Sequence, residues 1–142
     1  IDAKNELKKL GYGIIIYDAY RPWFVTKMFW EGTPENLKHF VANPENGSSH
    51  NKGCAIDIGL YDIKTGESIV MTSGYDEFTE RAYPNYMGGS KKQRDIRDML
   101  IRVMKKNDFT VYEYEWWHFN YNKCDSGIMD YSFSELDSLN SI

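Results

Sequence analysis

Apolar and polar residues alternate along residues 53–61, which is the pattern of a β-strand with two differently covered faces. Cys54, Ile56, Ile58 and Leu60 share one face, while Ala55, Asp57, Gly59 and Tyr61 share the other. Shorter runs rich in β-branched or aromatic residues predict further strands at 14–17, 69–71, 110–112 and 117–121.

A helical spacing of apolar residues predicts a long helix after Ser90, a good N-cap residue. We expect it to end near Asn107, and we expect shorter helices over residues 2–10 and 33–41. Residues 22–30 are apolar and fit either a helix or a strand. The pattern predicts an α+β fold with helices packed on a central, largely antiparallel sheet, in one domain over residues 1–142.

Composition and charge exclude several classes of function. The formal net charge is −4 and no basic stripe is present, so nucleic-acid binding lacks its electrostatic basis. No apolar run approaches the roughly 20 residues of a membrane span. Two isolated cysteines, Cys54 and Cys124, favour a reducing compartment, so we expect a cytoplasmic protein. The sequence leaves the oligomeric state open.

The first candidate for chemistry is the segment from Ser48 to Asp57. His50 lies in a predicted loop and Asp57 on the following strand, and Gly53 allows a sharp turn between them. Both side chains could then converge on one point, where the small neighbours Ala55 and Gly59 leave room for an ion. Taken singly, each residue is more simply explained as a hydrogen-bonded polar group.

The second candidate is Glu115-Trp116-Trp117-His118-Phe119. Residues three apart on a regular strand point to opposite faces, so Glu115 and His118 can converge only if Glu115 belongs to a bend before the strand. The alternative is a core strand in which His118 is incidental. That alternative explains the aromatic residues and leaves the glutamate unexplained.

Two imidazoles and a carboxylate form a three-ligand set suited to zinc with an open fourth position. A zinc-bound water also needs a base, for which Glu115 is the nearest unassigned carboxylate. Arg21, after the predicted strand 14–17, is a candidate to stabilise an oxyanion, although an exposed loop arginine is the simpler interpretation.

Several motifs together resemble the D-alanyl-D-alanine dipeptidases, the family that includes the vancomycin-resistance dipeptidase. Ser48-x-His50-x-x-Gly53-x-Ala55-x-Asp57 and Glu115-x-x-His118 are similar to the two parts of its metal motif. Residues 17–22 look like its arginine segment, and residues 73–78 and 80–84 look like its substrate-binding loop. The similarity runs from about Ala3 to about Leu136.

The resemblance implies that His50, Asp57 and His118 bind one zinc ion per chain and that Glu115 is the general base. Arg21 would polarise the scissile carbonyl. Asp76 would pair with the ammonium group of a D-Ala-D-Ala substrate, and Ser48 would help to bind its carboxylate. Members of the family carry several dozen residues before the helix that opens this chain, so we expect an N-terminal segment to be missing.

Two other functions fit parts of the sequence. A D,D-carboxypeptidase or endopeptidase acting on peptidoglycan stem peptides would use the same metal ligands, and Asp76 favours the dipeptidase over it. A non-catalytic zinc-bearing binding module of the same fold would lack the base, and Glu115 is present. The cellular role, whether antibiotic resistance, cell-wall recycling or D-alanine salvage, stays open.

Overall fold

The computed structural model describes residues 2–139. Contacts divide the chain into two compact units. Unit 1 comprises the described residues up to Asp18 together with Ile56–Cys124, and unit 2 comprises Ala19–Ala55 together with the described residues after Cys124.

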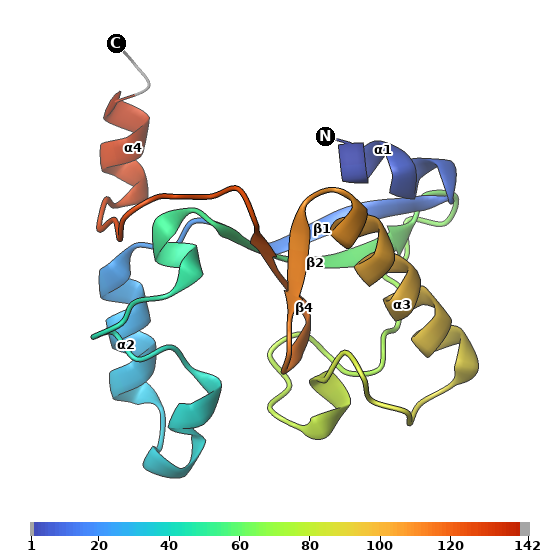
Figure 1. Cartoon of the computed structure of the whole chain (residues 1–142), viewed down its shortest axis with the longest axis horizontal. Coiled ribbons are helices and arrows are strands. Elements are labelled where there is room, and N and C mark those ends of the chain that lie inside the picture. The colour runs from blue at the N-terminus through green and yellow to red at the C-terminus, as the bar shows by residue number, and fades with distance from the viewer. Residues whose placement is uncertain (1, 140–142) are drawn as a thin grey trace. The chain divides into compact units, whose positions relative to one another are not determined.

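Unit 1 is built on a four-stranded sheet (Figure 1). Its strands are β1 (Tyr12–Asp18), β2 (Ala55–Asp62), β3 (Phe109–Tyr112) and β4 (Glu115–Tyr121), in the order β1-β2-β4-β3. β1 pairs antiparallel with β2, and β3 pairs antiparallel with β4. The helices α1 (Asp2–Lys9) and α3 (Lys91–Lys106) contact each other and the sheet. The predicted α+β fold with an antiparallel sheet is confirmed.

The start of α3 shows why this helix was predictable. Ser90 Oγ accepts a hydrogen bond from the Gln93 amide, and Gln93 Oε1 accepts one from the Ser90 amide, which completes a capping box. Apolar residues at helical spacing then face the core, among them Ile96, Leu100 and Val103. The helix ends with Asn107 as its C-cap residue, as predicted.

The predicted strand over residues 69–71 is wrong. This segment leaves the sheet after a single bridge between Tyr61 and Ser68. The Ile69 amide still donates to the Leu60 carbonyl of β2 at 2.8 Å, but the pairing goes no further along the segment. Residues 69–71 therefore continue as an extended connection.

Unit 2 is built from short helices. Residues 22–30, which fitted either element, form most of α2 (Trp23–Gly32). The short helix expected over 33–41 is the 3₁₀ helix η1 (Glu35–Phe40), and a second 3₁₀ helix, η2 (Ser49–Lys52), carries His50. The last described helix is α4 (Phe133–Leu139). A third 3₁₀ turn, η3 (Glu80–Ala82), belongs to unit 1.

The expectation of two isolated thiols is wrong, because Cys54 and Cys124 are each disulfide-bonded. The cysteines therefore give no support for a reducing compartment, and the cytoplasmic location stays a prediction. Within residues 2–139, no helix combines the length and the apolar character that crossing a bilayer requires.

Candidate functional site

In unit 1, Asp57 and His118 lie side by side on the neighbouring strands β2 and β4. His118 Nδ1 lies 3.0 Å from Asp57 Oδ1. Both residues are buried, with 5% of Asp57 and 9% of His118 exposed. A buried carboxylate needs a compensating positive charge, which a protonated imidazole or a metal ion can supply.

The second ring nitrogen of His118 shows which nitrogen a neutral ring would offer to a metal ion. His118 Nε2 lies 3.2 Å from Asn120 Oδ1, an amide oxygen that can only accept a hydrogen bond. Nε2 therefore carries the hydrogen, and in the neutral ring Nδ1 holds a lone pair directed towards Asp57. A lone pair and a carboxylate oxygen at this distance make a donor pair for a shared cation.

Glu115 meets His118 through an irregularity in strand pairing. Val111 pairs with Phe119 and Tyr112 with Glu115, so the register shifts between Val111 and Tyr112. This shift brings Glu115 Oε2 to 3.9 Å from His118 Nδ1, although the two residues are three apart. Glu115 is thus the first residue of β4 rather than part of a bend before it. The irregular register gives the convergence for which a bend was expected.

A residue that the sequence analysis missed, Tyr75, also contacts this group. Its hydroxyl donates a hydrogen bond of 3.2 Å to Asp57 Oδ2. Burial, followed by the nearby carboxylates of Asp57, Asp76 and Asp18, raises the pKa of Tyr75 well above its ordinary value. The hydroxyl is therefore protonated at neutral pH and acts as a donor.

The sequence analysis expected the small residue Gly59 to leave room for an ion beside Asp57, but a side chain occupies this space. Tyr17 is the residue at which the β1–β2 register shifts, and its ring stacks on that of Tyr75 with centroids 4.4 Å apart. A Cβ atom built on Gly59 would lie 2.3 Å from the Tyr17 hydroxyl oxygen. The room at Gly59 is thus filled by Tyr17, and it is not the place for an ion.

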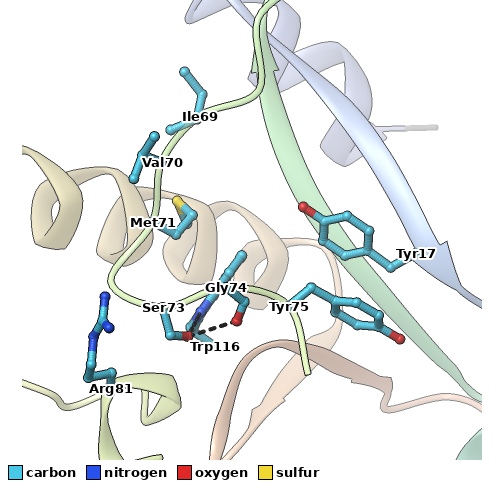
Figure 2. Close-up of a pocket in the computed structure, with 9 residues that line it drawn as sticks. All are labelled: Tyr17, Ile69, Val70, Met71, Ser73, Gly74, Tyr75, Arg81 and Trp116. Carbon is cyan, nitrogen blue, oxygen red and sulfur yellow. Dashed lines mark hydrogen bonds between the residues drawn. The ribbon is translucent and has the colours of Figure 1, made fainter. Parts of the chain in front are cut away.

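A cavity of about 200 Å³ lies next to these tyrosines (Figure 2). It is lined by Tyr17, Ile69, Val70, Met71, Ser73, Gly74, Tyr75, Arg81 and Trp116. Asp57, Glu115 and His118 are not among its lining residues. The cavity therefore adjoins the candidate ligands without including them.

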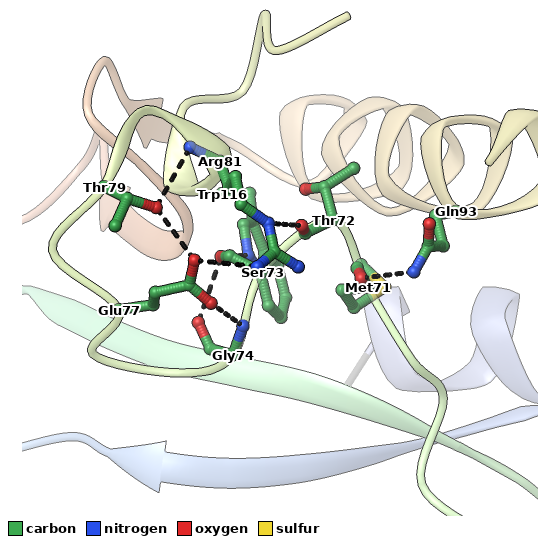
Figure 3. Close-up of polar contacts among 9 residues, drawn as sticks. All are labelled: Met71, Thr72, Ser73, Gly74, Glu77, Thr79, Arg81, Gln93 and Trp116. Carbon is green, nitrogen blue, oxygen red and sulfur yellow. Dashed lines mark hydrogen bonds and ion pairs between the residues drawn. The ribbon is translucent and has the colours of Figure 1, made fainter. Parts of the chain in front are cut away.

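The predicted substrate loop is held by side chains rather than by regular structure (Figure 3). Trp116 Nε1 donates to Ser73 Oγ at 2.8 Å, and Glu77 accepts from the Gly74 amide at 2.9 Å. The Gly74 amide, with Thr79 and Arg81, lowers the pKa of Glu77. Asp76 is exposed in this loop and has a φ of 54°, in the left-handed region. The loop thus holds Asp76 towards solvent on a fixed backbone.

Unit 2 carries the other predicted residues. His50 is 1% exposed, and its Nδ1 lies 2.7 Å from the carbonyl oxygen of Ala19. Because a carbonyl only accepts hydrogen bonds, Nδ1 carries the hydrogen and Nε2 keeps the lone pair that a metal ion requires.

Arg21 and Ser48 lie close to His50 in the same unit. The Arg21 amide donates to the His50 carbonyl at 3.1 Å, and Arg21 Nη2 donates to Ser48 Oγ at 3.5 Å. The Arg21 guanidinium also lies 5.2 Å from the centre of the Phe29 ring. Arg21 is half-buried rather than the exposed loop residue of the simpler interpretation.

Asn51 fixes this part of unit 2, and the sequence analysis did not single it out. Its side chain is 0% exposed, donates to the Arg21 carbonyl at 2.8 Å and to Thr26 Oγ1 at 2.9 Å, and accepts from the Ser48 amide at 2.8 Å. An asparagine beside a histidine gives no signal in a single sequence, because two of its partners, Arg21 and Thr26, lie 30 and 25 positions away.

Each unit therefore brings together three predicted residues. Unit 1 gathers Asp57, Glu115 and His118, and unit 2 gathers His50, Arg21 and Ser48. Among the predicted ligands, His50, Asp57 and His118 are all buried. His39, the remaining histidine, is exposed and packs on the Phe40 ring, which argues against a role as a ligand.

The known proteins that are similar to this chain belong to the family that its motifs resemble. D-alanyl-D-alanine dipeptidases from Enterococcus faecalis and Enterococcus faecium are 31% and 33% identical to it, over 83% and 84% of this chain and 66% and 67% of the relatives. The Escherichia coli D-alanyl-D-alanine dipeptidase is 34% identical over 77% of this chain and 55% of its own length.

The chain thus spans between about half and two thirds of the length of these relatives. The family described as D-ala-D-ala dipeptidase (peptidase M15) matches residues 1–137, nearly all of the sequence. The resemblance carried by the histidine, aspartate and glutamate motifs is therefore confirmed, and the chain belongs to the D-Ala-D-Ala dipeptidase family of M15 peptidases.

Proposed function

We propose that this protein is a zinc-dependent dipeptidase that hydrolyses D-Ala-D-Ala, with one zinc ion bound by His50, Asp57 and His118. The observation that supports it most directly is the buried pair of His118 Nδ1 and Asp57 Oδ1, 3.0 Å apart, with the Glu115 carboxylate 3.9 Å from the same nitrogen. A donor set of two imidazole nitrogens and one carboxylate oxygen suits Zn²⁺ and leaves one coordination position for water.

The zinc ion, when bound, supplies Lewis acidity and makes water a nucleophile near neutral pH. Glu115 then accepts the proton of the attacking water and transfers it to the amine that leaves. Its position is supported by the register shift at Tyr112, which holds the carboxylate next to His118. His118 cannot take over this task, because its Nδ1 lone pair is used for the metal.

Arg21 stabilises the negative charge that develops on the carbonyl oxygen of the scissile peptide bond. A guanidinium group is always charged and offers several N–H donors, which suits this task. Support comes from its fixed backbone, since the Arg21 amide and carbonyl are both hydrogen-bonded within unit 2. Ser48, whose hydroxyl contacts the guanidinium, is proposed to help bind the substrate carboxylate.

Asp76 is proposed to bind the free ammonium group of the dipeptide. Its exposed carboxylate lies on a loop that is fixed by Ser73 and Glu77, so the loop positions the carboxylate before a ligand binds. A free dipeptide carries one charge at each end, and a polar or charged partner at each end selects against longer peptides.

The decisive experiment combines metal content with product release. Purified protein, prepared without chelators, is expected to contain about one zinc per chain and to release D-alanine from D-Ala-D-Ala but not L-alanine from L-Ala-L-Ala. Asp57→Ala and His118→Ala should lose the zinc, whereas His39→Ala should keep it. A wild-type protein without metal, or hydrolysis that is unaffected by loss of the metal, would refute the proposal.

A further inference from the structure

The hydroxyl of Tyr75 and the ring of His118 contact different oxygens of the same carboxylate. Tyr75 donates to Asp57 Oδ2 at 3.2 Å, while Asp57 Oδ1 lies 3.0 Å from His118 Nδ1. We propose that Tyr75 is a positioning residue for the metal site, which fixes the Asp57 carboxylate so that Oδ1 is presented as the metal ligand. The inference rests on the proposed role of Asp57 as a zinc ligand.

The hydrogen bond from Tyr75 distinguishes the two oxygens of the Asp57 carboxylate. The terminal torsion of an aspartate is broad, so an Asp side chain alone does not settle which oxygen faces the ligand position. A donor on Oδ2 occupies that oxygen and leaves Oδ1 for the cation. Outer hydrogen bonds of this kind orient ligands and typically account for a 10- to 100-fold change in metal affinity.

The Tyr75 ring is fixed independently of its hydroxyl. Tyr17 stacks on one side with an interplanar angle of 23°, and Trp117 meets the ring edge-on at 70° with centroids 5.6 Å apart. Tyr17 is itself held over Gly59, where a Cβ atom would leave no room for it. Because packing holds the ring, Phe at position 75 should keep the same place and lose only the hydrogen bond.

The loop that carries Tyr75 is also held without the hydroxyl. Trp116 Nε1 binds Ser73, Glu77 binds the Gly74 amide, and Arg81 Nε donates to the Thr72 carbonyl at 3.2 Å. Tyr75→Phe should therefore leave Asp76 in place. Its effect is expected on metal affinity, whereas KM measured with the zinc-saturated enzyme should stay the same.

The test compares Tyr75→Phe with Tyr121→Phe, which removes a hydroxyl from an exposed tyrosine at the end of β4. Zinc affinity is measured by competition with a chromophoric chelator, and the melting temperature of the metal-free proteins is measured alongside. We expect the zinc Kd of Tyr75→Phe to rise 10- to 100-fold with the metal-free melting temperature unchanged, and that of Tyr121→Phe to equal the wild type.

An Asp57→Ala variant separates failure of this inference from failure of the proposed function. If Asp57→Ala loses zinc while Tyr75→Phe binds it as tightly as the wild type, the positioning role of Tyr75 is wrong and the zinc site stands. If Asp57→Ala retains the wild-type zinc affinity, the proposed ligand set is wrong, and the inference about Tyr75 falls with it. A lowered metal-free melting temperature in Tyr75→Phe would assign the hydroxyl a role in folding instead.

Discussion

Each of the two histidines proposed as ligands has one ring nitrogen in contact with an oxygen of the protein, and it is a different nitrogen in the two residues. His50 uses Nδ1 for the Ala19 carbonyl, which leaves Nε2, and His118 uses Nε2 for Asn120, which leaves Nδ1. In each case the neighbouring oxygen accepts, so a neutral ring would carry its hydrogen on that nitrogen and keep the other for a metal ion. The spacing of the motifs identifies the histidines, but the nitrogen that serves as a ligand is decided by neighbours up to 31 positions away in the sequence.

Glu115→Gln is predicted to bind zinc as the wild type does and to lower kcat by about 10²- to 10⁴-fold, the usual contribution of a general base. The amide keeps the size of the side chain but cannot accept the proton. Glu113→Gln, an exposed neighbour in the turn before β4, should leave kcat unchanged. Steady-state kinetics with elemental analysis checks both variants, and loss of zinc from Glu115→Gln would show that Glu115 is a ligand.

At the scale of elements, Gly59 in β2 leaves the space that the Tyr17 ring occupies. Gly59→Ala would place its Cβ 2.3 Å from the Tyr17 hydroxyl oxygen, so the ring must move from its position against Tyr75. Overpacking of this kind costs about 1–3 kcal/mol of unfolding free energy. Gly32→Ala, at the end of α2 with nothing within 4 Å of the new Cβ, is the matched control. Urea unfolding should separate the two variants, and equal midpoints would contradict this account.

The connection between η2 and its surroundings depends on Asn51. Asn51→Ala would remove a buried hydrogen bond to Thr26 Oγ1 and part-buried ones to the Ser48 amide and the Arg21 carbonyl. Each such loss costs about 1–3 kcal/mol of stability. Asn122→Ala, whose side chain bonds Thr110 at the exposed surface, should change stability by less than about 0.5 kcal/mol. Thermal unfolding of both variants tests the difference.

Helices and strands can be predicted from the sequence when the residues that define them are close together in the chain. α3 was predicted with its start and end because its cap residues and apolar spacing are local. The strand at 69–71 was wrong because pairing with the end of β2 stops after one bridge, between Tyr61 and Ser68, and no local pattern reports where pairing stops. Glu115, His50 and Asp57 were proposed from their motifs and stay predictions, whereas Tyr75 and Asn51 were missed because they have hydrogen-bond partners that are distant in sequence.

At the scale of the whole molecule, the prediction concerns substrate length. N-acetylation of D-Ala-D-Ala removes the ammonium charge that Asp76 is proposed to bind, so kcat/KM should fall at least about tenfold, equivalent to about 1.4 kcal/mol. Asp76→Asn should lower kcat/KM for the free dipeptide. The difference in kcat/KM between the free and the N-acetylated dipeptide should therefore become smaller. Equal cleavage of both by the wild type would instead support the D,D-carboxypeptidase alternative.

The backbone at Asp76 has a consequence for how specificity can change over generations. A φ of 54° admits aspartate, asparagine and glycine readily and strains most other residues. Codons for asparagine and glycine each differ from those for aspartate by one base. The negative charge can therefore be lost in a single mutational step that leaves the loop conformation intact. Given the proposed role of Asp76, one such mutation would relax the requirement for a free amino end without rebuilding the loop.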